Sequence, residues 1–235
     1  GFLGMMVDPK WDGAGLDSVA YVLALEEISR GCASTGVIMS VNNSLVCHPL
    51  EANGTDEQKE AFLKPLASGR WLGAYCLTEP QAGSDAGATK TVAVEDGDEW
   101  VVTGTKIFVT NGHYADAFVV YASTDPAQKT RGISAFVVEK SRQGVKLGTR
   151  EKTLGIRASA TSEIVFDNVR VPAENLLHEE GSGFAIAQAR LGPGRIHHCM
   201  RALGAAERAL ALMIDRVQTR VAFGKPLAEQ GVVRE

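Results

Sequence analysis

Two short segments carry the residue types that could bind a charged or aromatic ligand. The first, Tyr75-Cys-Leu-Thr-Glu-Pro-Gln-Ala-Gly-Ser-Asp85, follows a β-rich stretch with small residues, hydroxyl groups and backbone amides. A loop of this kind can hold an anion through its N–H groups. The second, Lys106-Ile-Phe-Val-Thr-Asn-Gly112, ends another β-rich stretch with an aromatic ring, a hydroxyl and an amide. Taken singly, each could equally be a plain turn at a strand end.

Other chemical motifs fail on inspection. Gly13-Ala-Gly15 and Gly181-Ser-Gly183 lack the third small position of a dinucleotide-binding loop, and no Gly-x-Ser-x-Gly nucleophile motif occurs. His197 and His198 are adjacent, so on a helix they point about 100° apart and cannot share a metal ion. We therefore predict a structural role for the histidine pair and no metal site.

Composition excludes several classes of protein. Of the 235 residues, 45% are hydrophobic and 22% are charged, as in ordinary globular domains with a sizeable core. The net charge of −4 comes without a basic run, so nucleic acid is not an expected partner. No apolar stretch reaches the roughly 18–20 residues of a membrane span. The four cysteines form no Cys-x-x-Cys pair, which predicts a reducing compartment and neither a zinc ribbon nor a disulfide framework.

The elements that must position the two segments follow from hydrophobic periodicity. Asp17 is a good N-cap for a first helix, Cys32 to Cys47 suits a mostly buried second helix, and a capping-box pattern from Thr55 opens a third that stops at Gly69. From there to Pro172 the sequence consists of short segments rich in β-branched and alternating apolar residues. These predict strands over 72–77, 89–94, 100–103, 106–110, 117–122, 133–138 and 163–169.

Turn signals and a second helical region complete the organisation. Asp96-Gly97 and Asn111-Gly112 predict hairpin turns. Helical periodicity returns at Ser182, breaks at Pro193 and then continues as a long bundle helix. The predicted fold class is α+β with three domains: N-terminal helices over 1–70, a β-barrel or sandwich over 71–175, and the start of a C-terminal helical bundle over 176–235. Because residue 1 is Gly and the chain stops at Glu235 without a cap, we expect a fragment.

In this order and at this separation, the two segments resemble motifs of the acyl-CoA dehydrogenase family. There the first reads close to Tyr-Cys-x-Thr-Glu-Pro-x-Ala-Gly-Ser-Asp and the second close to Trp-Ile-Thr-Asn-Gly. The likeness is strongest to short-chain, butyryl-CoA-type members and extends over the whole chain, through Glu26–Arg30, Val41–Ser44, Gly132–Phe136, Lys152–Arg157, Phe166–Pro172 and Arg220–Lys225.

The resemblance implies FAD as cofactor and an acyl-CoA thioester as substrate. Residues that match the family's FAD site are Tyr75, Cys76, Leu77, Thr78, Gly83, Ser84, Phe108, Val109, Thr110, Arg220 and Phe223. Those that match its substrate contacts are Ser84 and Arg195.

Individual roles follow from the same resemblance. The Leu77 backbone and the Thr78 hydroxyl would bond the pyrimidine edge of the flavin, and Thr110 would reach N5. Phe108 replaces the family's usual Trp beside the ring, so the contact has less area and no indole N–H. Arg220 and Phe223 would reach the FAD of a neighbouring subunit, which implies a homodimer or homotetramer.

The family reaction is α,β-dehydrogenation to a trans-2-enoyl-CoA, with electrons passed to an electron-transfer flavoprotein. A glutamate removes the α-proton, and in a minority of members it lies where this chain has Gly194. We therefore expect no catalytic base in this chain, with the base beyond Glu235, and Glu207 is assigned a helix–helix contact instead. Gly192 also replaces an acidic CoA contact. The expected compartment is the cytoplasm in a bacterium or the mitochondrial matrix in a eukaryote.

Two alternatives stay open from the sequence. The Phe108 and Gly192 substitutions also suit a family relative acting as a flavin oxidase or monooxygenase. A non-catalytic chain that binds acyl-CoA or a partner subunit is the third possibility, since part of a helical bundle leaves an apolar face uncovered.

Overall fold

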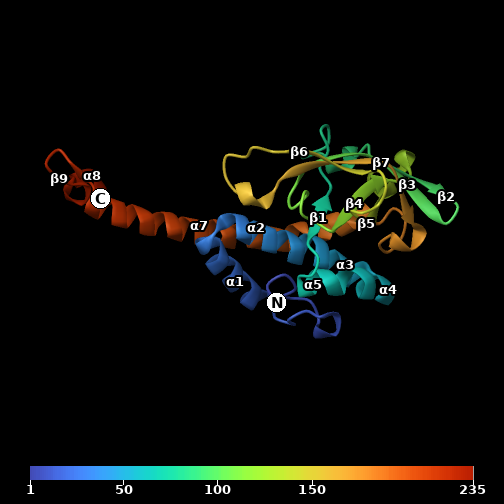
Figure 1. Ribbon diagram of the computed structural model, residues 1–235, viewed down its shortest axis with the longest axis horizontal. Coiled ribbons are helices and arrows are strands. Elements are labelled where there is room, and N and C mark those ends of the chain that lie inside the picture. The colour runs from blue at the N-terminus through green and yellow to red at the C-terminus, as the bar shows by residue number, and fades with distance from the viewer. Residues whose placement is uncertain (235) are drawn as a thin grey trace.

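The computed structural model describes residues 1–234 and places two helical regions around a curled, mixed sheet (Figure 1). The helices α1 and α2 lie against one side of the molecule, and the last long helix extends away from it. This order of helices, sheet and helices confirms the predicted fold class, with a curled sheet in the place of the barrel or sandwich.

The N-terminal helices begin and end where their caps predict. Asp17 accepts a hydrogen bond from the Ala20 amide at 2.8 Å, and Thr55 and Gln58 form a reciprocal capping box. Gly69 ends the region with a φ of 80°, a conformation that glycine adopts without strain. The elements are α1 (Ser18–Gly31), α2 (Ala33–Val41), the π-helical η2 (Asn42–Cys47), α3 (His48–Asn53), α4 (Asp56–Gln58), the π-helical η3 (Lys59–Leu63) and α5 (Lys64–Ser68).

Seven strands form the sheet. In spatial order they run β1, β4, β2, β3, β7 and β6, and β5 pairs with β4 off this path. The β1–β4 pair is parallel, whereas β2–β3, β3–β7, β4–β5 and β6–β7 are antiparallel. Their bounds are β1 (Gly73–Cys76), β2 (Val92–Asp96), β3 (Glu99–Val109), β4 (Ala117–Ser123), β5 (Ile133–Glu139), β6 (Val145–Arg150) and β7 (Ser162–Pro172).

The sheet differs from the predicted strands at three places. β3 runs without a break through Gly104, because a register shift against β7 absorbs the irregularity. β6 was not predicted; it is a half-exposed edge strand with little apolar alternation. Asn111-Gly112 closes no hairpin, because β3 pairs with β2 and β7, and the Asn111 side chain instead donates through Nδ2 to the Gly73 carbonyl at 3.0 Å.

The C-terminal region consists of α6 (Gly183–Ala189), α7 (Leu191–Thr219), the small β8 (Val221–Ala222) and β9 (Lys225–Pro226) ribbon, and α8 (Gly231–Arg234). The predicted break falls at Arg190 rather than at Pro193. Pro193 lies in the first turn of α7, where its missing N–H costs no hydrogen bond. At Gly204 the helix approaches α1 so closely that an added Cβ would overlap the Glu26 carbonyl oxygen.

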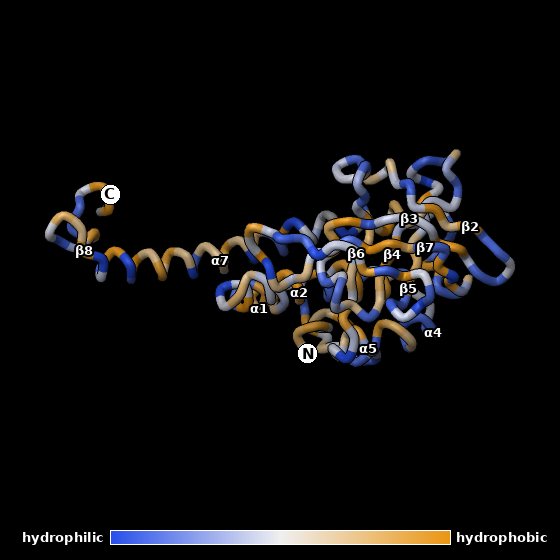
Figure 2. Tube along the Cα trace, turned by 45° about the horizontal axis from the view of Figure 1, so that its top comes forward, coloured by the Kyte–Doolittle hydropathy of each residue, from blue (hydrophilic) through white to orange (hydrophobic). Residues whose placement is uncertain are grey.

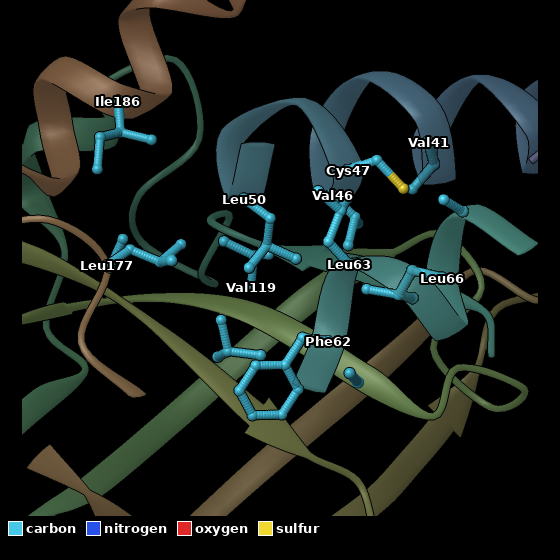
Figure 3. Close-up of a cluster of buried hydrophobic side chains, with 14 of the residues drawn as sticks. Val41, Val46, Cys47, Leu50, Phe62, Leu63, Leu66, Val119, Leu177 and Ile186 are labelled. Atoms are coloured by element: carbon cyan, nitrogen blue, oxygen red, sulfur yellow. The ribbon is translucent and has the colours of Figure 1, made fainter. Parts of the chain in front are cut away.

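One hydrophobic core joins the helices to the sheet. Figure 3 shows its side chains converging from both helical regions onto β4. Because residues from both helical regions and the sheet share this core, their relative positions are fixed by apolar burial. The labelled members are Val41, Val46, Cys47, Leu50, Phe62, Leu63, Leu66, Val119, Leu177 and Ile186.

The distal half of α7 projects beyond the rest of the molecule (Figures 1 and 2). Apolar side chains alternate with polar ones along it, and several are exposed, among them Leu210, Met213 and Ile214. Within residues 1–234 no helix is both long enough and apolar enough to cross a membrane.

Candidate functional site

The two segments singled out in the sequence lie side by side. The Ile107 amide donates to the Thr78 carbonyl at 2.9 Å, and the Lys106 Nζ donates to the Leu77 carbonyl at 3.2 Å. The exit of β1 and the end of β3 are therefore bonded directly to each other. These bonds bring Leu77 and Thr78, just after β1, next to the last residues of β3, where Phe108 and then Thr110 follow.

A buried ion pair holds the loop after β1 in place. Glu79 Oε1 lies 2.7 Å from Lys106 Nζ, and the two side chains are 2% and 0% exposed. The same carboxylate accepts hydrogen bonds from the Lys90 and Thr91 amides. Burial would by itself raise the pKa of Glu79, but Lys106 and these donors outweigh it and hold the pKa below its usual range.

The Phe108 side chain is presented outward by a strained backbone. Its φ is 55°, in the left-handed region that bulky side chains disfavour, and the residue is 60% exposed. It lies within a register shift between β3 and β7. Strained backbone conformations of this kind cluster at functional sites. They persist only where the surrounding interactions offset their unfavourable free energy.

A cavity of about 590 Å³ lies beside Thr110, just after the end of β3. Its walls come from α2, η2, the end of β3, the loop before β7 and the first turns of α7. The apolar part includes Val37, Val41 and Leu45. The polar part includes Thr110 and a group of guanidinium, imidazole and hydroxyl side chains, which are Ser40, Ser44, Arg190, Arg195, His198 and Arg201.

Arg190 is the most deeply buried of these cations. It is 4% exposed, and one nitrogen, Nη2, lies 3.4 Å from His197 Nδ1. Because arginine can only donate, His197 must accept through an unprotonated Nδ1. Burial, and then the charges of Arg190 and Arg201, lower the pKa of His197 to about 4. His197 is therefore neutral at pH 7, and it packs edge-on against Tyr21 at a centroid distance of 4.7 Å.

The remaining predicted residues of the two segments divide by exposure. Cys76 and Val109 are buried, and Tyr75 packs against Tyr121 with ring centroids 5.0 Å apart. Burial raises the pKa of both Tyr75 and Cys76 to about 12, so neither ionises near neutral pH. Gly83 and Ser84 are exposed on the loop.

Two predicted residues lie far from the rest. Arg220 and Phe223 are at the end of the projecting α7 helix and in the β8–β9 ribbon (Figure 1). Phe223 is 99% exposed. Within one chain these residues do not meet Thr78 or Phe108.

Sequence reasoning missed part of the cavity wall. Ser40, Ser44, Arg190 and Arg201 were not singled out, and His198 was assigned only a structural role. Their signal was available: His198 and Arg201 are three residues apart and share a helix face. Glu207, which was assigned a helix–helix contact, is instead exposed on α7.

Three family models match consecutive parts of the chain. They are the N-terminal domain of acyl-CoA dehydrogenase over residues 1–70, its middle domain over 74–169 and its C-terminal domain over 181–235. The chain belongs to the acyl-CoA dehydrogenase family. The resemblance drawn from the two segments is thereby confirmed, and with it the assignment to an oxidoreductase family.

Acyl-CoA dehydrogenases of short-chain type are among its similar relatives. The human mitochondrial short-chain enzyme is 49% identical and matches 100% of this chain and 57% of its own length. Butyryl-CoA dehydrogenase of Megasphaera elsdenii superposes with a TM-score of 0.94 at 42% identity, covering 100% of this chain and 62% of that chain. The chain thus spans less than two thirds of the relatives that it matches.

Two further solved structures bear on cofactor and partner. A chain in a structure described for the electron transferring flavoprotein of Acidaminococcus fermentans has a TM-score of 0.95 at 44% identity, and the match covers 100% of this chain and 62% of that one. A glutaryl-CoA dehydrogenase of Mycobacterium smegmatis, solved with FADH2, has a TM-score of 0.90 at 36% identity, covering 100% of this chain and 59% of that one. This acyl-CoA dehydrogenase family is one of FAD flavoproteins, as the sequence predicted.

Proposed function

We propose that this chain forms part of the flavin site and part of the acyl-binding cavity of a short-chain acyl-CoA dehydrogenase. Such an enzyme converts an acyl-CoA thioester to the trans-2-enoyl-CoA. The direct bonding of Thr78 to Ile107, next to a cavity that Thr110 and Arg195 line, carries the proposal. Adjacent flavin and acyl sites are what transfer of a hydride between them needs. The similarity to butyryl-CoA dehydrogenase supports the substrate class.

The residues present fit FAD. Phe108 offers an exposed aromatic face, and Thr78 and Thr110 bring hydroxyl groups from the two bonded segments. A Cβ added at Gly83 would meet no atom within 4 Å, so the loop leaves open space beside Ser84. When bound, FAD supplies the acceptor for the hydride that leaves the acyl β-carbon.

Each binding residue has a defined task in this proposal. The Leu77 backbone and the Thr78 hydroxyl hold the pyrimidine edge, Thr110 holds N5, and Phe108 covers the ring. Tyr75, Cys76 and Val109 pack behind them. Ser84 contacts the pyrophosphate and the pantetheine, and Arg195 contacts the acyl-CoA.

We place the base for α-proton removal outside the described residues. No aspartate or glutamate of residues 1–234 lines the cavity. Gly194 occupies the position at which a minority of family members have their catalytic glutamate. An added Cβ at Gly194 would lie 3.2 Å from the Arg190 guanidinium, so this position faces a cation rather than open space.

The assembly and the electron acceptor are further parts of the proposal. Arg220 and Phe223 are too far from Phe108 to serve the same chain, so we assign them to the FAD of a second subunit in a homodimer or homotetramer. The electron-transfer flavoprotein is the proposed acceptor, supported by the neighbour of 44% identity. We also propose that the chain has three domains, with limits near residues 70 and 175.

Binding of FAD and its reduction test this function separately. We expect fluorescence titration to show FAD binding, weakened at least about tenfold by Thr78→Val, because one hydrogen bond to a charged or strongly polar group contributes about 1.5 kcal/mol. Thr149→Val, exposed on the edge strand β6, is the matched control and should leave the affinity unchanged. Failure of the unsubstituted protein to bind FAD would refute the proposal.

The visible spectrum then locates the base. If residues 1–234 contain no base, butyryl-CoA added under anaerobic conditions should bind to the 235-residue chain but leave its flavin oxidised, with the visible absorption band unchanged. Bleaching of the band would show that a base is present in this chain and would contradict its placement outside.

A further inference from the structure

The polar wall of the cavity carries positive charge without a negative partner. Arg190, Arg195 and Arg201 line it, and no carboxylate of the described residues does so. Burial lowers the pKa of Arg190 and of Arg201, yet a guanidinium stays protonated at neutral pH. The two histidines nearest to them add no charge, because burial and these arginines lower the pKa of both His197 and His198.

Arg190 has donors to spare. It is only 4% exposed, and within residues 1–234 its Nε and Nη1 have no hydrogen-bond partner. The third nitrogen donates to a neutral histidine. The largest electrostatic influences on Arg190 come from Tyr21, Tyr75, Arg201 and Tyr121, none of them a carboxylate.

An unpaired buried cation of this kind is unfavourable unless a ligand compensates it. An uncharged acyl chain would leave the donors of Arg190 unsatisfied, whereas a carboxylate would satisfy them with charge-assisted hydrogen bonds. Ser40 and Ser44 add hydroxyl groups to the same wall. Val37, Val41 and Leu45 provide the apolar surface that the methylene groups of an acyl chain need.

We propose that the acyl cavity accepts an acyl group that ends in a carboxylate, so that the substrate is the CoA thioester of a short dicarboxylic acid. Arg190 pairs with the terminal carboxylate, and Arg201 adds to the positive potential of the wall. The proposal rests on the acyl-CoA dehydrogenase function above and specifies its substrate class.

Matched pairs of thioesters test the proposal by binding. Isothermal titration of the FAD-loaded protein with succinyl-CoA and butyryl-CoA compares a terminal carboxylate with a methyl group at equal chain length, and glutaryl-CoA with pentanoyl-CoA repeats the comparison one carbon longer. We expect the dissociation constant of the carboxylate member to be about 10- to 100-fold lower in at least one pair, as for a hydrogen-bonded buried charge.

Two variants separate the role of Arg190 from general charge. Arg190→Gln should bring the ratio of the two dissociation constants close to one. Arg216→Gln removes an exposed cation of the same helix, outside the cavity, and should leave the ratio unchanged. Should Arg190→Gln fail to fold by circular dichroism, Arg190→Lys keeps the charge and should retain a reduced preference.

The outcomes distinguish the substrate class from the function. Tighter binding of butyryl-CoA and pentanoyl-CoA by the unsubstituted protein would overturn the carboxylate proposal and leave the dehydrogenase function standing. An equal ratio in the unsubstituted protein and in Arg190→Gln would also overturn it. Binding of neither member of either pair would contradict the dehydrogenase function itself.

Discussion

The Glu79 carboxylate and the Lys106 ammonium group lie 2.7 Å apart in the interior and join the loop after β1 to strand β3. Lys106 also donates to the Leu77 carbonyl, next to the residue that we assign to the flavin edge. The ion pair thus fixes the distance between the loop after β1 and the end of β3. Neither residue is proposed to touch a ligand, so their role is positioning.

Removal of one partner of this pair should be strongly destabilising. Lys106→Met leaves the Glu79 carboxylate buried without its cation, and we expect a loss of about 3–5 kcal/mol in the free energy of unfolding. The double variant Glu79→Gln/Lys106→Met buries no charge and should lose less than Lys106→Met alone. Urea unfolding measures both. A double variant that is less stable than Lys106→Met would argue against the ion pair as the cause.

The strained backbone at Phe108 should lower stability in exchange for ligand contact. Phe108→Asn relieves the unfavourable φ, because asparagine tolerates the left-handed region, and should raise the free energy of unfolding by about 1 kcal/mol. The same substitution should weaken FAD binding, since the exposed ring is lost.

Phe2→Asn is the matched control for Phe108→Asn. Phe2 is 61% exposed but is not in the left-handed region, so this substitution should bring no gain in stability and no loss of FAD affinity. Equal stability changes for the two variants would exclude relief of strain at Phe108.

The close contact of α7 with α1 depends on Gly204. A Cβ there would overlap the Glu26 carbonyl, so Gly204→Ala should destabilise the protein by about 1–3 kcal/mol, as overpacking of a tight contact does. Gly192→Ala, at the start of the same helix, meets no atom within 4 Å and serves as control; it should be neutral or slightly stabilising. Thermal unfolding followed by circular dichroism compares them, and equal effects would contradict the close packing at Gly204.

Stability should fall in acid because His197 is held neutral. Its pKa is about 4 in the folded protein and about 6.5 when unfolded, so between these values the unfolded chain binds more protons. The free energy of unfolding should therefore decrease from about pH 7 to pH 4, by at most about 3 kcal/mol from this group.

Substitution of His197 separates this effect from other titrations. His197→Gln should flatten the decrease in stability between pH 7 and pH 4 measured by urea unfolding. His178→Gln, exposed on the surface, is the control and should keep the slope of the unsubstituted protein. An unchanged slope in His197→Gln would exclude His197 as the source.

Local signals predicted the fold well where neighbours in sequence decide the structure. The Asp17 cap, the Thr55–Gln58 capping box and the Asp96-Gly97 turn were all predicted from a few consecutive residues, and the structure has them. Strand β6 escaped prediction because its exposed edge position requires no apolar alternation. The hairpin expected at Asn111-Gly112 was wrong, since strand pairing across the sheet is decided by contacts far apart in the sequence.

The sequence by itself determined the family and the residues of the two segments. Residue types and their order along the chain can be compared with the motifs of a family without any knowledge of the fold. Only the tertiary structure decided that Thr78 and Ile107 are bonded and that Glu79 pairs with Lys106, residues 27 positions apart. It also decided that Arg190 is buried with free donors, since burial depends on how α2, η2 and α7 pack together. A charged residue near a helix start gives no sign of this in the sequence, where arginine is normally a surface residue.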